Sequence, residues 1–207
     1  MLIIGLTGSI GMGKSTAAKN FASFGIPVYD ADAAVHALYD KGGAAVSEIA
    51  REFPGAVKDG RVDRAALSKL VVGDQSAMNR LEAITHPLVY RAREEFLARH
   101  AEEGAPMVVL EIPLLFETGA DAGVDVVVVV SAPEGMQRAR ALSREGMTEE
   151  KLAGILSRQW PDAMKRARAD FIVDTAKSHA ESAQTVKSIV AALKGREGKA
   201  WAAKRQR

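Results

Sequence analysis

The sequence contains no cysteine among its 207 residues. It can therefore form no disulfide, zinc–thiolate site or iron–sulfur cluster, and it has no cysteine nucleophile. Its histidines are also few, and their spacing is not that of metal ligands; they are His36, His86, His100 and His179. The classes of protein that depend on cysteine chemistry or on histidine metal clusters are excluded.

Long hydrophobic runs are missing as well. The longest stretch, residues 124–130, is interrupted by Asp125, and it falls far short of the roughly 18–20 residues that a membrane span needs. The first residues, MLIIGLTGS, lack the basic region of a signal peptide. Together with the absence of cysteine, this predicts a cytoplasmic protein without a membrane partner.

Net charge is small, at +2, but it is unevenly distributed. Residues 194–207 hold six basic residues and one acidic residue, which leaves a net charge of −3 on the rest of the chain. We therefore expect a solvated, partly disordered basic tail and no nucleic-acid partner. The alternative is a nucleic-acid-binding module that acts through this tail. Nothing in the sequence sets an oligomeric state.

Five short apolar stretches, rich in β-branched residues, predict strands at 2–6, 26–29, 107–112, 124–130 and 171–173. Each is nearly continuous rather than alternating, which is typical of parallel strands buried on both faces. Helical patterns lie between them. Strand–helix alternation predicts an α/β fold, a three-layer α/β/α sandwich with a five-stranded parallel sheet.

Residues 32–105 depart from this alternation because they show helical stretches and no strong strand. A helical segment of this length exceeds an ordinary crossover, so we interpret it as an inserted helical subdomain; one long irregular connection is the alternative. Pro87 should break or kink its last helix. The predicted organisation is a core over 1–31 and 106–193, the insertion over 32–105, and the basic tail over 194–207.

Residues 8–15 read GSIGMGKS and are followed by Thr16. This is the G-x-x-x-x-G-K-S pattern of a phosphate loop, placed between a predicted strand and a predicted helix. The glycines Gly8, Gly11 and Gly13 let the backbone curl. The N–H groups of residues 11–16, which include Met12 and Thr16, would then surround a phosphate. Lys14 would face the β- and γ-phosphates, and the hydroxyl of Ser15 would ligate Mg²⁺. The pattern predicts binding of ATP with Mg²⁺.

Two carboxylates, Asp30 and Asp32, end the second predicted strand. Ligands of open α/β sheets sit beyond the carboxyl ends of the strands, and residues two apart on a strand point to the same side. A carboxylate there could take the proton of an attacking hydroxyl, or hold Mg²⁺ through water. The alternative is that either residue caps a helix that begins at Ala33.

Arg140 and Arg144 follow the fourth predicted strand, four residues apart on one predicted helical face, with Gly146 and a second helix behind them. Such a pair fits a closing lid over about 134–160, with the arginines stabilising charge on a transferred phosphoryl group. A solvated basic face is the alternative. Ser131 is the expected cap of the first lid helix, and Glu117 could equally be solvated.

The guanine-reading N-K-x-D motif of a GTPase is absent, because the fourth strand ends in VVSAP. Small size and a long helical insertion favour a kinase for a small acceptor. A nucleotide switch that regulates a partner protein is the alternative from another functional class.

These segments, in order over residues 2–175, resemble the dephospho-CoA kinase family. The resemblance rests on GLTGSIGMGKST at 5–16, DAD at 30–32, DGRVDRAAL at 59–67, the His86-Pro87 pair, PLLFE at 113–117, Gln137 with Arg140 and Arg144, Gln159, and ADF at 169–171. The phosphate loop is common to many kinases, whereas DAD, PLLFE and Q-x-x-R-x-x-x-R are specific. Ser9 and Met12 stand where the family often has Gly and Ser, and Asp174-Thr175 stands where an Asn is common.

The resemblance implies a P-loop kinase that moves the γ-phosphoryl group of ATP to the 3′-hydroxyl of dephospho-CoA, the last step of CoA synthesis. It also implies that Asp32 is the base, that Arg140 and Arg144 belong to the lid, and that the insertion binds the acceptor. The residues alone lead only to a small-molecule kinase, so another P-loop small-molecule or nucleotide kinase is the alternative.

Overall fold

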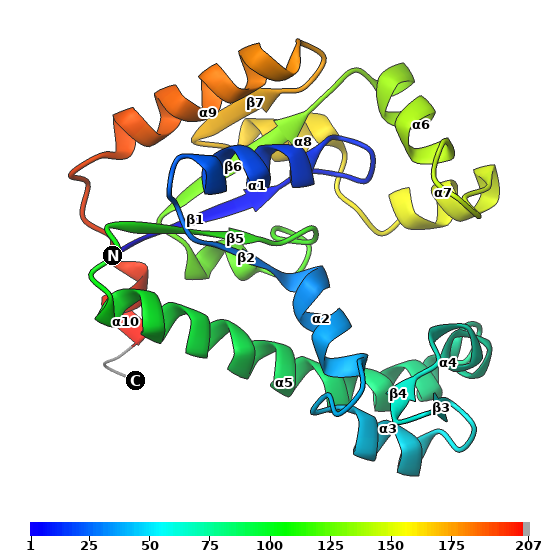
Figure 1. Ribbon diagram of the computed structural model, residues 1–207. Coiled ribbons are helices and arrows are strands. Elements are labelled where there is room, and N and C mark those ends of the chain that lie inside the picture. Colours follow the sequence, from blue (N-terminus) through cyan, green and yellow to red (C-terminus); the bar gives the residue numbers. More distant parts are fainter. Residues whose placement is uncertain (205–207) are drawn as a thin grey trace. The chain divides into compact units, whose positions relative to one another are not determined.

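The computed structural model describes residues 1–204 and has the elements labelled in Figure 1. The chain divides into two compact units, residues 1–29 with residues from 99 onward, and residues 30–98. Arg205 and Arg207 of the predicted tail lie outside the described residues. Over residues 1–204, none of the helices combines the length and the apolar character needed to cross a bilayer.

The first unit contains a five-stranded sheet with the strand order β2-β5-β1-β6-β7. Its strands are β1 (Leu2–Thr7), β2 (Val28–Asp30), β5 (Met107–Glu111), β6 (Val126–Ser131) and β7 (Phe171–Asp174). β1 pairs in parallel with β5 and with β6, and β6 pairs in parallel with β7. The predicted five-stranded α/β sheet is confirmed, with strand bounds within two residues of those expected.

Both faces of this sheet are buried, which explains why its strands read as continuous apolar runs. On β6, Val126, Val128 and Val130 join the cluster that contains Phe21 of α1 and Ile189 of α9. The intervening valines of β6 join a second cluster, made with residues of the segment after β5 and with Trp160. Successive side chains of one strand thus enter two different cores.

The helices of this unit are α1 (Lys14–Ser23), α6 (Glu134–Leu142), α7 (Glu149–Leu156), α8 (Asp162–Ala167), α9 (His179–Leu193) and α10 (Ala200–Lys204), with a 3₁₀ turn at Ala120–Gly123. α1 packs against α9, and α8 packs against β6 (Figure 1). Thr148 caps α7 as its position predicts, by accepting a hydrogen bond from the Lys151 N–H. Ser178 and Glu181 form a capping box at the start of α9, which fixes where that helix begins.

The second unit holds α2 (Ala31–Tyr39), α3 (Val46–Glu52), α4 (Arg64–Val71) and most of α5 (Gln75–Glu102). It has a core of its own, formed by Ala45, Ile49, Phe53, Ala56, Val62, Leu67, Val71 and Ala77. Asp63 caps α4 by accepting from two backbone N–H groups. Its helical character matches the sequence, and its role in binding an acceptor stays a prediction.

Two details of this unit correct the sequence analysis. A short antiparallel hairpin, β3 (Val57–Lys58) with β4 (Arg61–Val62), occupies a region where no strand is expected; strands of two residues are too short to give a periodic pattern. The break expected at Pro87 does not occur, since α5 runs through it. A proline removes only one N–H donor from the ladder, and α5 has 28 residues.

Lys194, Arg196 and Lys199 of the C-terminal segment are exposed, as expected of a solvated basic tail, but the backbone of the segment is bonded to the core. The backbone N–H groups of Lys199 and Ala200 donate to Oδ1 of Asp125, at 2.6 and 2.8 Å, while Oδ2 accepts from the Ile3 N–H at 2.8 Å. α10 packs against β1. Asp125, which interrupts the valine run in the sequence, therefore joins this segment to the amino-terminal part of β1.

We expect Asp125→Asn to lower the free energy of unfolding by about 1–3 kcal/mol, because an amide presents one acceptor and one donor to three N–H groups. Urea denaturation followed by circular dichroism measures this. Glu197→Gln is the matched control, since Glu197 is exposed in the same segment and should change stability by less than about 0.5 kcal/mol. Equal stability of the two variants would contradict the role given to Asp125.

Candidate active site

The phosphate loop, residues 8–15, joins the carboxyl end of β1 to the first turn of α1. It lies close to the backbone of two neighbouring elements. A Cβ at Gly8 would stand 2.4 Å from the Val130 carbonyl oxygen of β6, and a Cβ at Gly11 would stand 2.5 Å from the Gln137 carbonyl oxygen of α6. Both distances are shorter than any side chain allows, so glycine is required at these two positions.

A threonine that follows β7 holds the centre of the loop. The Thr175 hydroxyl donates to the Met12 carbonyl oxygen at 2.7 Å, and the Thr175 N–H donates to the Ser131 carbonyl oxygen at 2.9 Å. The Met12 side chain is buried, and its sulfur accepts from the Ala132 N–H at 3.1 Å. The loop is thus fixed from the carboxyl ends of β6 and β7, where ligands of such sheets bind.

Arg140 is part of the same arrangement. Its guanidinium donates to the Thr175 hydroxyl at 2.9 Å and to the Thr175 carbonyl oxygen at 2.7 Å. Arg144 is exposed and lies beyond α6, which ends at Leu142. The expected face with both arginines on one helix is therefore wrong, because the chain leaves the helix at Ser143 and turns at Gly146 (φ 70°) into α7.

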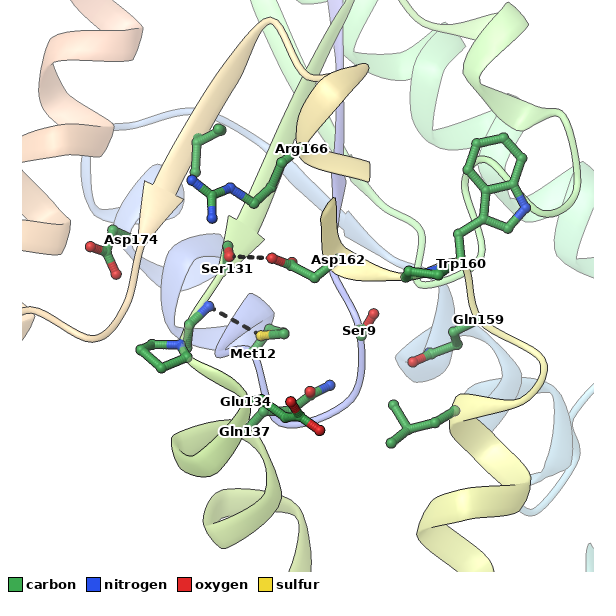
Figure 2. A pocket seen from close by; sticks show the side chains of 15 residues that line it. Ser9, Met12, Ser131, Glu134, Gln137, Gln159, Trp160, Asp162, Arg166 and Asp174 are labelled. Carbon is green, nitrogen blue, oxygen red and sulfur yellow. Dashed lines mark hydrogen bonds between the residues drawn. The ribbon is translucent and has the colours of Figure 1, made fainter. Parts of the chain in front are cut away.

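A cavity of about 600 Å³ opens beside the loop. Figure 2 shows its wall, formed by Ser9, Met12, Ser131, Glu134, Gln137, Gln159, Trp160, Asp162, Arg166 and Asp174 with neighbouring apolar residues. Ser131, expected to cap α6, instead donates its hydroxyl to Oδ2 of Asp162 at 2.7 Å, and Pro133 occupies the cap position. The bond joins β6 to the start of α8.

Glu117 of the PLLFE segment is buried and charged, which corrects the solvated alternative. Its Oε1 lies 2.7 Å from the Lys165 ammonium and accepts from the Trp160 N–H at 2.6 Å. Lys165 is fully buried, and Glu117 has 9% of its side chain exposed. Burial alone would raise the pKa of Glu117, but the bonds from Lys165 and Trp160 outweigh it and hold the pKa below its ordinary value.

The aromatic residues around this ion pair form one stack. Trp160 stacks on Phe116 with ring centroids 5.5 Å apart and planes 11° from parallel, and the Arg168 guanidinium lies over both rings. Leu115 and Phe116 are buried, so these two residues of the PLLFE segment serve packing. The stack fixes the chain between α7 and α8 against the segment after β5.

The carboxylates Asp30 and Asp32 belong to the second unit. Asp30 caps α2 by accepting from the Ala33 N–H at 2.9 Å, and the helix begins at Ala31 rather than at Ala33. Asp32 is exposed in the first turn of that helix. The two side chains therefore do not share the side that a strand would give them, since residues two apart on a helix do not face each other.

The phosphate loop offers one side-chain oxygen, the Ser15 hydroxyl, that fits an Mg²⁺ ion bound to a nucleotide. Among the described residues, no group of three metal-ligating side chains forms a cage for a metal. Mg²⁺ bound to a nucleotide takes most of its ligands from phosphates and water and needs few from the protein. Ser15 is exposed in the first turn of α1, where its hydroxyl can supply one.

Comparison with known proteins identifies the family to which this chain is similar. A family model described as dephospho-CoA kinase matches residues 2–181. A dephospho-CoA kinase from Mesorhizobium japonicum is 54% identical over 198 residues, which cover 96% of this chain and all of that protein. Another from Rhizobium etli is 56% identical over 96% of this chain and 97% of that protein.

The chain belongs to the dephospho-CoA kinase family. Among solved structures, one from Thermus thermophilus matches with a TM-score of 0.79 and 39% identity, covering 94% of this chain and 98% of that one. The fold also matches a dephospho-CoA kinase from Campylobacter jejuni, with a TM-score of 0.66 and 24% identity over 92% and 96% of the two chains. The family suggested by the sequence segments is confirmed.

Some members of this dephospho-CoA kinase site escape sequence analysis. Thr175 stands out in the sequence only because an Asn is common there, yet it links Arg140 to the loop. Lys165 carries no signal at all, because a lysine in a basic helix gives no sign that it is buried. Its partner Glu117 could have been suspected from its place in the specific PLLFE segment.

We expect Glu117→Gln to lower the free energy of unfolding at neutral pH by about 3–5 kcal/mol, because it leaves the Lys165 ammonium buried without its counter-charge. Urea denaturation across pH measures this. Since the pKa of Glu117 is lowered in the folded state, its contribution is present above the unfolded pKa and is lost as pH falls through the folded pKa.

The difference in free energy of unfolding between the wild type and Glu117→Gln should therefore be largest at neutral pH and should decrease as the pH falls. The exposed Glu102→Gln is the control for loss of one surface carboxylate. A difference that stayed constant down to about pH 3, below the ordinary pKa of a glutamate, would exclude the charged pair as its cause.

Proposed function

We propose that this protein transfers the γ-phosphoryl group of ATP to the 3′-hydroxyl of dephospho-CoA and releases CoA and ADP. The observation that carries the proposal is a phosphate loop fixed against β6, α6 and Thr175 in a chain that matches dephospho-CoA kinases over nearly its whole length. The loop supports binding of ATP, the phosphoryl donor. The family relationship supports dephospho-CoA as the acceptor.

The phosphate loop would hold the triphosphate of MgATP. Backbone N–H groups of Gly11, Met12, Gly13, Lys14, Ser15 and Thr16 would surround the β-phosphate, with Gly8 allowing the curl. Because α1 begins at Lys14, the positive end of its helix dipole lies at the loop and suits an anion. The Lys14 ammonium would neutralise the β- and γ-oxygens, and the Ser15 hydroxyl would ligate Mg²⁺.

Asp32 would act as the base. The acceptor's 3′-oxygen attacks the γ-phosphorus, the bond from that phosphorus to the β–γ bridging oxygen breaks, and the hydroxyl proton passes to the Asp32 carboxylate. Asp32 is exposed, as a group that must meet a substrate has to be. The insertion over 32–105 would bind the rest of the acceptor.

Arg140 and Arg144 would stabilise charge on the transferred phosphoryl group as part of a lid over about 134–160. Arg140 is already held beside the loop by Thr175. Arg144, exposed beyond α6, has the freedom that a group recruited on closure needs. A cytoplasmic location, with no nucleic-acid or membrane partner, stays the prediction made from the sequence.

The proposal is tested by supplying the purified protein with ATP, Mg²⁺ and a panel of acceptors. We expect dephospho-CoA to be converted to CoA, measured by chromatography, with no reaction when Mg²⁺ is chelated. Nucleosides, nucleoside monophosphates and shikimate should be inert. Phosphorylation of one of these while dephospho-CoA is unchanged would instead identify another P-loop kinase.

The role of Asp32 is tested by Asp32→Asn. Loss of the proton acceptor should lower kcat by about 10²–10⁴-fold, while calorimetry shows ATP binding unchanged. Asp40→Asn is the matched control, the same substitution at an exposed residue directly after the other end of α2. Wild-type turnover in Asp32→Asn would remove Asp32 from the mechanism.

A further inference from the structure

One residue of the phosphate loop is held by two side chains through both of its backbone groups. The Ile10 N–H donates to Oε1 of Gln159 at 3.1 Å, and the Ile10 carbonyl oxygen accepts from Nε2 of Gln137 at 2.9 Å. A backbone N–H can only donate and a carbonyl can only accept, so the orientation of each side-chain amide is fixed. The loop bends at Ile10 between two glutamines.

These glutamines come from the two ends of the predicted lid. Gln137 lies in the first turn of α6, and Gln159 lies three residues beyond the end of α7. Figure 2 shows them on separate segments beside the loop. They are 127 and 149 residues from Ile10 in the sequence. The segment that contains α6 and α7 therefore contacts the same residue, Ile10, near both of its ends.

Both contacts lie where the loop is tightly packed. Gln137 is 7% exposed, and its own carbonyl oxygen is the atom that a Cβ at Gly11 would meet. Gln159 is followed by Trp160 and Asp162, whose bonds to Glu117 and Ser131 fix that end of the lid. Ile10 precedes the residues proposed to surround the β-phosphate, so a shift of its peptide would displace their N–H groups.

We infer that Gln137 and Gln159 are positioning residues that hold the phosphate loop in its ATP-binding conformation and connect both ends of the lid to it. The inference rests on the proposed function. A preorganised loop binds phosphate without first losing conformational freedom. Movement of either lid hinge is transmitted to Ile10, which couples closure to the geometry of the donor.

The opposite hydrogen-bonding roles of the glutamines provide the test. A glutamate at 159 can still accept from the Ile10 N–H, whereas a glutamate at 137 cannot donate and sets a carboxylate against a carbonyl oxygen. Gln159→Glu and Gln137→Glu add the same charge beside the same residue, Ile10, so each is the charge control for the other. Gln184→Glu, on the exposed part of α9, controls for the substitution itself.

We expect Gln137→Glu to weaken ATP binding, measured by calorimetry, by about tenfold or more, because the partly buried Ile10 carbonyl loses its donor and meets a carboxylate. Its KM for ATP should rise and its kcat fall, with the KM for dephospho-CoA unchanged. Gln159→Glu should stay within about threefold of the wild type, whereas Gln159→Met should lose about tenfold in ATP affinity. Gln184→Glu should match the wild type.

The double variant Gln137→Met with Gln159→Met should lose less affinity than the sum of the losses of the two single variants, because both glutamines hold the same residue, Ile10. The Met variants also serve as the test if the Gln137→Glu protein does not fold. The inference would be overturned if Gln137→Glu and Gln159→Glu lost the same ATP affinity, or if the losses of the two single Met variants added up fully in the double variant. Lower melting temperatures of the variants with unchanged ATP affinity would overturn it as well. ATP binding needs no acceptor, so failure of the wild type to phosphorylate dephospho-CoA would reject the proposed function separately.

Discussion

The close approach of the phosphate loop to the backbones of β6 and α6 is the constraint on which the site depends. Gly8 faces a carbonyl oxygen of Val130, and Gly11 faces a carbonyl oxygen of Gln137. Contacts this close leave no room for a side chain, and glycine at these positions lets the backbone of the loop curl. A carboxyl end of β6 that was displaced or mobile would leave the loop without its support.

Hydrogen bonds from distant segments complete that support. Thr175 after β7 bonds the Met12 carbonyl, and two glutamines bond Ile10. Every one of these bonds reaches the loop backbone rather than its side chains. Met12, which stands where the family often has Ser, adds a contact through its side chain, because its sulfur accepts from the Ala132 N–H. Its thioether fills a buried space beside Ala132.

The sequence predicts the sheet and the loop well because both depend on local patterns. A parallel strand buried on two faces must be continuously apolar, and the phosphate loop needs glycine, lysine and serine at fixed spacing. What it misses depends on tertiary partners. Ser131 looks like a helix cap but bonds Asp162, Glu117 looks solvated but is paired with a buried lysine, and the charged C-terminal segment is held by Asp125. Each of these roles is decided by a residue tens of positions away.

The same distinction explains how the candidate lid is built. Its ends are fixed by partly buried hydrogen bonds: Gln137 and Arg140 of α6 reach Ile10 and Thr175, and the segment after α7 reaches Glu117. Its middle, by contrast, is exposed around Arg144 and Gly146. Elements with few buried contacts open at low free-energy cost, whereas buried networks do not. Such a lid can move Arg144 while Arg140 stays bonded to Thr175, and the loop keeps its shape as long as Gln137 and Gln159 stay bonded to Ile10.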